Sequence, residues 1–166
     1  MSDPSGDLAA ADIVAVGAQL GREPRGVHAV AHRCRCGLPD VLETLPRLPD
    51  GTPFPTLYYL TCPRLVGAVS TLEASGLMRA MTERLGTDDE LAADYRGSHR
   101  AYLARREQLG TVPEIDGVSA GGMPTRVKCL HVLVGHALAE GRGANRLGDE
   151  ALERIDPWWT AGPCVD

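Results

Sequence analysis

Four cysteines have the residue type and the local context of metal ligands. Cys34 and Cys36 stand one residue apart, and Gly37 after them favours a turn that directs both sulfurs to one point. Cys62 precedes a proline, and a Cys-Pro pair recurs among the ligands of ferredoxin-type clusters. Tetrahedral zinc and iron–sulfur clusters both commonly take four thiolates. We therefore predict that Cys34, Cys36, Cys62 and Cys129 bind one zinc ion or one iron–sulfur cluster.

The spacing of these cysteines leaves alternatives open. After Cys-x-Cys come 25 residues, then Cys62, then 66 more residues before Cys129. This spacing lacks the Cys-x-x-Cys pairs of zinc ribbons, so zinc and an iron–sulfur cluster stay unresolved. Cys62 and Cys129 could instead be buried apolar side chains, as free cysteines often are, or one thiol could do redox or nucleophilic chemistry. Cys164 is left over from the predicted set.

The segment around Cys129 is predicted to be helical, from Pro124 to about Glu140. On a regular helix His131 would point to nearly the opposite side from Cys129. His136 would share a face with Cys129 but lie about 10 Å further along the axis. This geometry predicts that the helix offers one metal ligand, Cys129.

A glycine-rich turn, Ser-Ala-Gly-Gly-Met-Pro-Thr-Arg-Val-Lys over residues 119–128, precedes that predicted helix. Gly121 and Gly122 would let backbone amides converge, and a helix N-terminus favours an anion. Arg126 and Lys128 add positive charge. We predict that these four residues bind a small anionic ligand, a phosphate or a carboxylate, beside the metal. The alternative is that the glycines only ease a tight entry into the helix.

The other histidines and the carboxylates indicate no reaction. His28 and His32 share one face of a predicted strand near Cys34, where either could support or replace a metal ligand. A hydrogen-bonded structural histidine is the alternative for each. The chain has no Ser-His-Asp order and no carboxylates with a reason to pair. Catalytic residues are therefore unassigned, and whether the protein is an enzyme stays open.

Composition narrows the class of protein. The net charge of −5 gives no general support for nucleic-acid binding. The first residues lack the basic region of a secretory signal, and the apolar run after them, interrupted by Asp12, is too short to span a bilayer. We expect a cytoplasmic protein without a membrane span, in which five reduced cysteines point to metal binding or catalysis before disulfides.

The pattern of elements predicts an α+β fold with a single globular domain over residues 7–166, after a disordered start at residues 1–6. A small irregular β-hairpin or sheet in the N-terminal half should pack with four to six helices. A proline-rich hairpin through residues 49–55 would bring Cys62 back towards Cys34 and Cys36. The expected strands are 27–33, 41–45 and 56–61, and the expected helices are 7–20, 63–75, one ending at 85, 87–109 with a capping box at 87–90, 124–140 and one starting at 148.

Three stretches carry a resemblance to a known family. They are His-Arg-Cys-Arg-Cys-Gly-Leu-Pro from His32, Pro-Arg-Leu-Pro-Asp-Gly-Thr-Pro-Phe-Pro-Thr-Leu-Tyr-Tyr-Leu-Thr-Cys-Pro-Arg from Pro46, and Ser-Ala-Gly-Gly-Met-Pro-Thr-Arg-Val-Lys-Cys-Leu-His from Ser119. Over about residues 13–160 the chain resembles the actinobacterial family of domain of unknown function 501. The resemblance implies a bacterial cytosolic protein, often encoded beside a septum-formation initiator protein and an exopolyphosphatase, and implies no activity.

Three functions follow as hypotheses. The first is a metalloprotein whose four-thiolate site is mainly structural. The second is an enzyme with an open metal position beside the turn at residues 121–128, holding an anionic ligand. The third is an interaction module in a cell-division or envelope complex, with a structural metal and with Trp158 and Trp159 as its contact surface.

Overall fold

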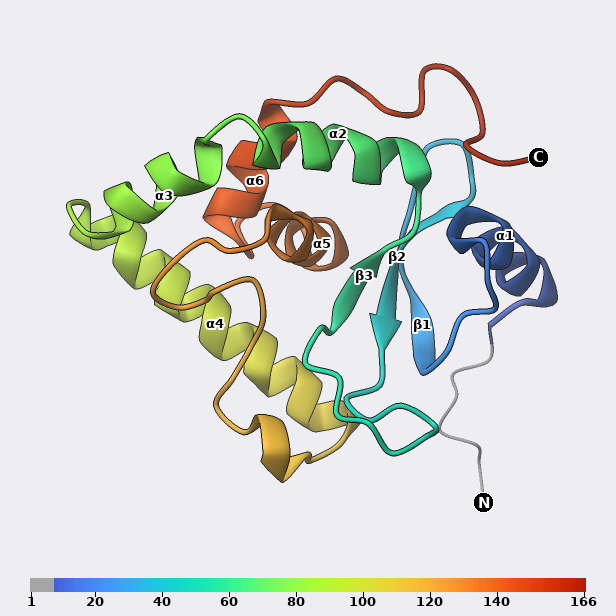
Figure 1. The fold of residues 1–166 in the computed structure, drawn as a ribbon, viewed down its shortest axis with the longest axis horizontal. Coiled ribbons are helices and arrows are strands. Elements are labelled where there is room, and N and C mark those ends of the chain that lie inside the picture. The colour runs from blue at the N-terminus through green and yellow to red at the C-terminus, as the bar shows by residue number, and fades with distance from the viewer. Residues whose placement is uncertain (1–7) are drawn as a thin grey trace.

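A three-stranded sheet and six α-helices make up the fold, which is seen in Figure 1. The computed structural model describes residues 8–166, so the disordered start predicted at residues 1–6 lies outside the described residues. The predicted α+β class is confirmed. In chain order the elements are α1 (Ala10–Leu20), β1 (Val27–Arg33), β2 (Pro39–Thr44), β3 (Tyr58–Leu60), α2 (Pro63–Glu73), α3 (Leu77–Leu85), α4 (Asp89–Leu109), the 3-10 turn η1 (Pro113–Ile115), α5 (Leu130–Glu140) and α6 (Arg146–Glu153).

The sheet is antiparallel throughout, in the order β1-β2-β3. Val41 in β2 pairs with Leu60 in β3, and the amide of Thr61 donates to the carbonyl of Asp40 at 3.0 Å. The chain therefore returns through the proline-rich hairpin, as predicted, and Cys62 follows β3 beside the start of β2. Cys34 follows β1 on the other side of β2, where its amide donates to the carbonyl of Leu38 at 2.9 Å.

The two faces of the sheet pack against different helices. Val41 and its neighbours in β3 join the main core, which includes buried residues of α2, α3, α4, α5 and α6. Leu42, the next residue along β2, instead packs with Val16 of α1 and Val27 of β1. Successive side chains of a strand point to opposite faces, which explains this division. Figure 1 accordingly places α1 apart from the other five helices, with the sheet between them.

Helix α5 occupies the centre of the main core, where Figure 1 shows it nearly end-on. Seven of its eleven residues are buried. A Cβ atom at Gly135 would lie 3.2 Å from the carbonyl oxygen of Tyr58, so the glycine lets α5 approach β3 closely. A Cβ atom at Gly148 of α6 would lie only 2.1 Å from the carbonyl oxygen of Leu133. Both crossings of α5 therefore depend on glycine.

Four helix starts differ from the sequence-based expectation. Helix α1 begins at Ala10, with Ala9 as its N-cap, where the expected helix began at residue 7. Helix α5 begins at Leu130, because residues 120–129 form a series of turns instead of the helix predicted from Pro124. Asp88 caps α4 by accepting a hydrogen bond from the amide of Leu91 at 3.0 Å, where the capping box placed that role at Thr87. Asn145 caps α6 in the same way, so this helix starts before Gly148. Among residues 8–166, none of the helices combines the length and the hydrophobicity needed to cross a lipid bilayer.

Substitution of Gly148 tests the close crossing of α5 and α6. Gly148→Ala should lower the free energy of unfolding by at least about 1–3 kcal/mol, because the methyl group must displace backbone. Gly67→Ala in α2 is the matched control, since a Cβ there meets nothing within 4 Å. That variant should gain roughly 0.5–1 kcal/mol from helix propensity. Urea denaturation of both variants measures the difference, and an unchanged Gly148→Ala would contradict the crossing.

Candidate metal centre

The glycine-rich turn forms one wall of a cleft of about 720 Å³. The carbonyl of Gly121 accepts hydrogen bonds from the amides of Lys128 at 2.7 Å and Cys129 at 3.3 Å, which folds the segment back on itself. Gly121 and Gly122 have φ of +70° and +93°, a region that favours glycine. The four residues predicted to bind an anion, Gly121, Gly122, Arg126 and Lys128, all line this cleft, and so does Cys129.

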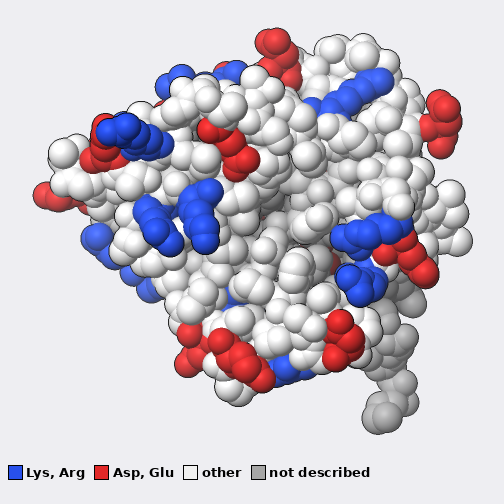
Figure 2. All heavy atoms as spheres, in the orientation of Figure 1, with Lys and Arg blue, Asp and Glu red and all other residues white. Residues whose placement is uncertain are grey.

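Basic side chains mark this part of the surface. Arg126 and Lys128 are exposed, and neither has an ion-pair partner among the residues the structure describes. Figure 2 shows basic side chains over the region where Figure 1 places the chain between α4 and α5. The loop is tied to α4 beneath them, since Ser119 Oγ lies 2.8 Å from His99 Nδ1. The cleft therefore has a fixed wall and two unpaired positive charges.

The helix N-terminus beside this cleft already has an internal anion. The Leu130 amide, first in α5, donates to Oε2 of Glu73 at 2.9 Å. Glu73 is the last residue of α2, so its carboxylate bridges the end of one helix and the start of another. The positive end of a helix favours such a carboxylate. Residues 121–128 therefore form turns and do not provide the helix N-terminus that was predicted to bind an anion. The N-terminus of α5 lies at Leu130, where Glu73 already accepts a hydrogen bond from the backbone amide.

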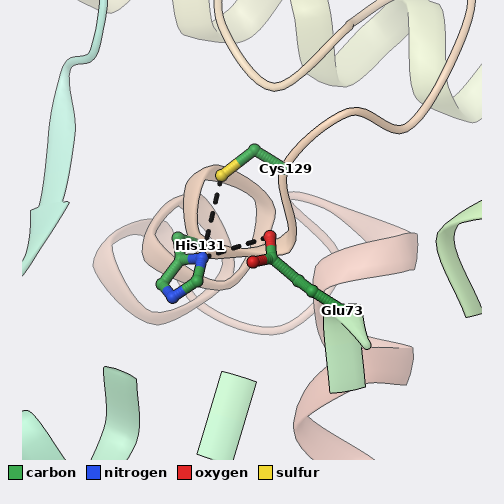
Figure 3. Close-up of side chains that lie close together, drawn as sticks. All are labelled: Glu73, Cys129 and His131. Carbon is green, nitrogen blue, oxygen red and sulfur yellow. Dashed lines mark hydrogen bonds and ion pairs between the residues drawn. The ribbon is translucent and has the colours of Figure 1, made fainter. Parts of the chain in front are cut away.

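Three potential metal ligands meet at this point, as Figure 3 shows. Nδ1 of His131 lies 3.1 Å from Oε2 of Glu73 and 3.8 Å from Sγ of Cys129. All three ligand atoms lie within 4.8 Å of one another, and this is the one such group of three or more His, Cys, Asp or Glu residues in the described chain. The side chains of Glu73 and His131 are about three-quarters buried.

The convergence of Cys129 and His131 corrects the helical argument made from the sequence. Cys129 is the N-cap of α5 with an extended backbone, at φ −150° and ψ 115°. The two residues therefore do not follow helical spacing, and their side chains turn to the same side. His136 behaves as expected, because it is fully buried and bonds Glu140 and Asn145 at 3.1 and 3.3 Å, away from Cys129.

The protonation of His131 follows from its two neighbours. Hydrogen bonding to Cys129 and the charge of Glu73 raise the pKa of His131 to about 9, although burial acts in the opposite direction. Its other nitrogen, Nε2, lies 3.3 Å from Oγ of Ser70. Without a bound cation the imidazole is therefore protonated at neutral pH and supplies positive charge between a thiol and a carboxylate.

The distances match tetrahedral zinc. Zinc–ligand bonds of about 2.3 Å to sulfur and about 2.0–2.1 Å to nitrogen and oxygen separate sulfur from nitrogen by about 3.6 Å and nitrogen from oxygen by about 3.3 Å. The observed separations of 3.8 and 3.1 Å are close to both values. A nucleophilic triad fits less well, because there the thiol and the orienting carboxylate approach opposite nitrogens of the imidazole. Here both approach Nδ1.

The five cysteines fall into separate groups. Cys34 and Cys36 lie in one turn, where the Cys36 amide donates to Sγ of Cys34 at 3.5 Å. Cys62, at the start of α2, has the thiol of Cys164 as a neighbour. Cys129 lies at the far end of α2, beside Glu73. The 11 residues of α2 span roughly 16 Å. The structure therefore does not bring Cys129 to the other three predicted ligands, and the four-cysteine site stays a prediction.

The strand histidines have carboxylate partners of their own. His32 Nδ1 lies 2.6 Å from Oδ1 of the fully buried Asp40. His28 Nε2 lies 3.8 Å from Oε1 of Glu43. Neither joins a cluster of three potential ligands in the described part of the chain. Each pairing matches the structural alternative stated for these residues.

Sequence reasoning missed Glu73 and His131 as members of the site. Glu73 is separated from Cys129 by 55 residues, and nothing in its local sequence distinguishes it from other carboxylates at helix ends. The Cys-x-His spacing of residues 129–131 was a usable signal. It would have identified His131 if the helix had been started at Leu130.

A family model covers most of this architecture. The model described as a protein of unknown function, DUF501, matches residues 30–153, about three-quarters of the chain. The chain belongs to the DUF501 family. It matches no curated protein and no solved structure.

The DUF501 match includes Glu73, Cys129 and His131, so the candidate metal centre lies wholly within the family region. Cys34, Cys36 and Cys62 also lie within the matched residues. Cys164 lies outside them, in the segment that follows α6. The family description carries no activity, so any function must be argued from the site itself.

NMR titration of His131 in chelator-treated protein tests the charge arrangement. We expect its pKa near 9 and a lower value in Cys129→Ser, because the thiol is the largest cause of the shift. A raised pKa in the folded state stabilises the fold below the unfolded value of about 6.5. That contribution should be lost as the pH rises through 9. His99 is the internal control: burial, Arg100 and Arg106 lower its pKa, which Cys129→Ser should leave unchanged.

Proposed function

We propose that this protein binds a divalent transition metal ion, with zinc as the best fit, through Cys129, His131 and Glu73. The observation that carries the proposal is the approach of a thiol and a carboxylate to the same imidazole nitrogen, at 3.8 and 3.1 Å. Their near-tetrahedral separations support one shared ion. A protonated histidine between two acidic groups is the arrangement expected if no cation is bound, so metal analysis decides between the two.

The mixture of ligand types favours zinc over an iron–sulfur cluster at this group. Zinc accepts sulfur, nitrogen and oxygen ligands together, whereas iron–sulfur clusters are held mainly by cysteine thiolates. Three protein ligands also leave one coordination position for water or substrate, as in catalytic zinc sites. A closed structural site would need a fourth protein ligand, and no fourth His, Cys, Asp or Glu joins this group among the described residues.

The cleft supplies a reason to expect an anionic ligand. Cys129 belongs both to the metal group and to the wall of the cleft. Arg126 and Lys128 line the same cleft without ion-pair partners in the described chain. We infer that a phosphate- or carboxylate-bearing molecule is held by these two side chains, with one end near the metal. Zinc there could activate a water molecule for hydrolysis of that ligand.

Two earlier hypotheses stay open as alternatives. The four-cysteine iron–sulfur or zinc site would require Cys129 to travel the length of α2 to meet Cys34, Cys36 and Cys62. The interaction module in a cell-division or envelope complex would use Trp158 and Trp159. Both tryptophans are half-buried, with ring centroids 4.8 Å apart. No observation on that surface favours a protein partner over the metal site.

Metal analysis of purified protein and of single variants tests the proposal. We expect one zinc per chain, and a loss of affinity of about tenfold or more in His131→Ala and Glu73→Gln, because each removes or weakens a ligand. Cys129→Ser should behave likewise, whereas Cys34→Ser, a matched change at a predicted ligand outside the group, should keep full zinc. Equal loss in Cys34→Ser and Cys129→Ser would instead support the four-cysteine site. No metal in wild-type protein after zinc addition would overturn both.

Anion binding is tested separately in zinc-loaded protein. Calorimetric titration with inorganic phosphate should show binding that weakens at least about tenfold when Arg126 and Lys128 are both changed to alanine, because a charge-assisted hydrogen bond contributes roughly 1.5–3 kcal/mol. The Arg96→Ala/Arg100→Ala variant, with two cations on α4 outside the cleft lining, is the control. Zinc content should be unchanged in both double variants. Equal phosphate affinity in all three proteins would remove the anionic ligand from the proposal and leave the metal site standing.

A further inference from the structure

A second group of thiols lies at the other end of α2. The thiols of Cys62 and Cys164 are neighbours although 101 residues separate them in the chain, and Cys164 packs against the core that contains Cys62. Cys62 is 1% exposed and belongs to the main core. Cys164 is half-buried, in the segment of residues 157–166 that Figure 1 shows running past α2. Nη1 of Arg64 donates to the carbonyl of Gly162 at 2.7 Å and holds that segment against the start of α2.

We propose that Cys62 and Cys164 form a site of oxidative modification, at which exchange with a small oxidised thiol compound creates a disulfide. Because the two thiols are neighbours in the folded chain, side-chain movement can bring their sulfurs to the disulfide bond length of about 2.0 Å. Nothing in the metal proposal uses either thiol. The bond would join the C-terminal segment covalently to the core.

The surroundings of the two sulfurs assign them different roles. Nε2 of Gln19 donates to Sγ of Cys164 at 3.3 Å and to the carbonyl of Pro39 at 2.7 Å. A carbonyl can only accept, so the Pro39 contact fixes the amide with its nitrogen towards the sulfur. Cys164 is half-buried whereas Cys62 is 1% exposed, so a reagent from solvent reaches Cys164 more easily. Burial and the neighbouring thiol raise the pKa of Cys62 to about 11. Cys164 is therefore the thiol that reacts first.

The reaction balances with the small disulfide as the oxidant. The Cys164 thiolate attacks one sulfur of the reagent, forms a mixed disulfide and releases one reagent thiolate. Cys62 then loses its proton to solvent and attacks Sγ of Cys164, which releases the second reagent thiolate. The protein loses two electrons and two protons, and the reagent is reduced to two thiols.

Two competing fates for these thiols are weaker. Cys34 and Cys36 are also neighbours, but a bond between residues two apart in a tight turn would close a small strained ring. A metal held by Cys62 and Cys164 would need further ligands. In the described chain neither thiol joins a group of three or more His, Cys, Asp or Glu residues whose ligand atoms lie within 4.8 Å of one another. The pair is therefore better placed to bond to itself than to complete a four-ligand site.

Peptide mapping identifies the bond directly. Tryptic cleavage puts each cysteine in a different peptide: Cys62 in residues 48–64, Cys164 in 155–166, Cys129 in 129–142, Cys36 in 36–47 and Cys34 in 34–35. Reduced, metal-free protein is incubated with oxidised glutathione, remaining thiols are alkylated, and the digest is analysed by mass spectrometry without reduction. We expect one dominant cross-link, between peptides 48–64 and 155–166. A dominant cross-link elsewhere, or glutathione retained on Cys164 with Cys62 alkylated, would overturn the proposal.

Variants separate this site from the metal centre. Cys164→Ser should lose the cross-link, and Cys129→Ser should keep it. The oxidised wild-type protein should also melt at a higher temperature than the reduced one, because the bond restricts the unfolded chain. That rise should vanish in Cys164→Ser. Zinc or iron that depends on Cys164 in the reduced protein would show that the thiols serve a metal, and would count against the disulfide.

Discussion

The carboxylate of Glu73 holds together the end of α2 and the start of α5. It accepts the Leu130 amide at 2.9 Å and lies 3.1 Å from Nδ1 of His131. The first amides of a helix have no partner within the helix, so a buried N-terminus needs an acceptor from elsewhere. Because Glu73 of α2 supplies that acceptor, α5 begins at Leu130 and Cys129 becomes its N-cap residue. In this position Sγ of Cys129 points towards the imidazole of His131.

The position of α5 affects much of the fold, because α5 packs against several other elements. Gly135 allows close approach to β3, and Gly148 allows close approach of α6. Inside the helix, His136 is fully buried, with Glu140 and Asn145 at its two ring nitrogens. A buried polar group with all its partners supplied fixes one arrangement of the core. His131 differs, because its neighbours are a thiol and a carboxylate, and that thiol, Cys129, also lines the cleft.

The sequence predicted the elements better than their junctions. Alternation and β-propensity placed β1 at residues 27–33, and Gly21 correctly ended α1 after Leu20. The start of α5 was wrong because Pro124 suits a first helical position locally. The bonds from the Gly121 carbonyl to two amides, seven and eight residues on, instead close a loop. Helix propensity, which depends on neighbouring residues, does not predict hydrogen bonds between residues seven or eight positions apart. Nor can it reveal Glu73, whose role depends on the packing of α2 against α5.

Chain topology also explains why the cysteines divide as they do. Cys34 and Cys62 follow β1 and β3 on either side of β2, so the predicted hairpin does bring these two regions together. Cys129 lies apart from them along α2, which has Cys62 at one end and Glu73 at the other. Cys164 lies beside Cys62 because the chain after α6 returns past α2. The pattern of hydrophobic residues in the sequence does not predict this proximity. The environments at the two ends then favour different chemistry. Imidazole and carboxylate around Cys129 complement a cation, whereas Cys62 and Cys164 have each other, the side-chain amide of Gln19 and backbone amides at the start of α2.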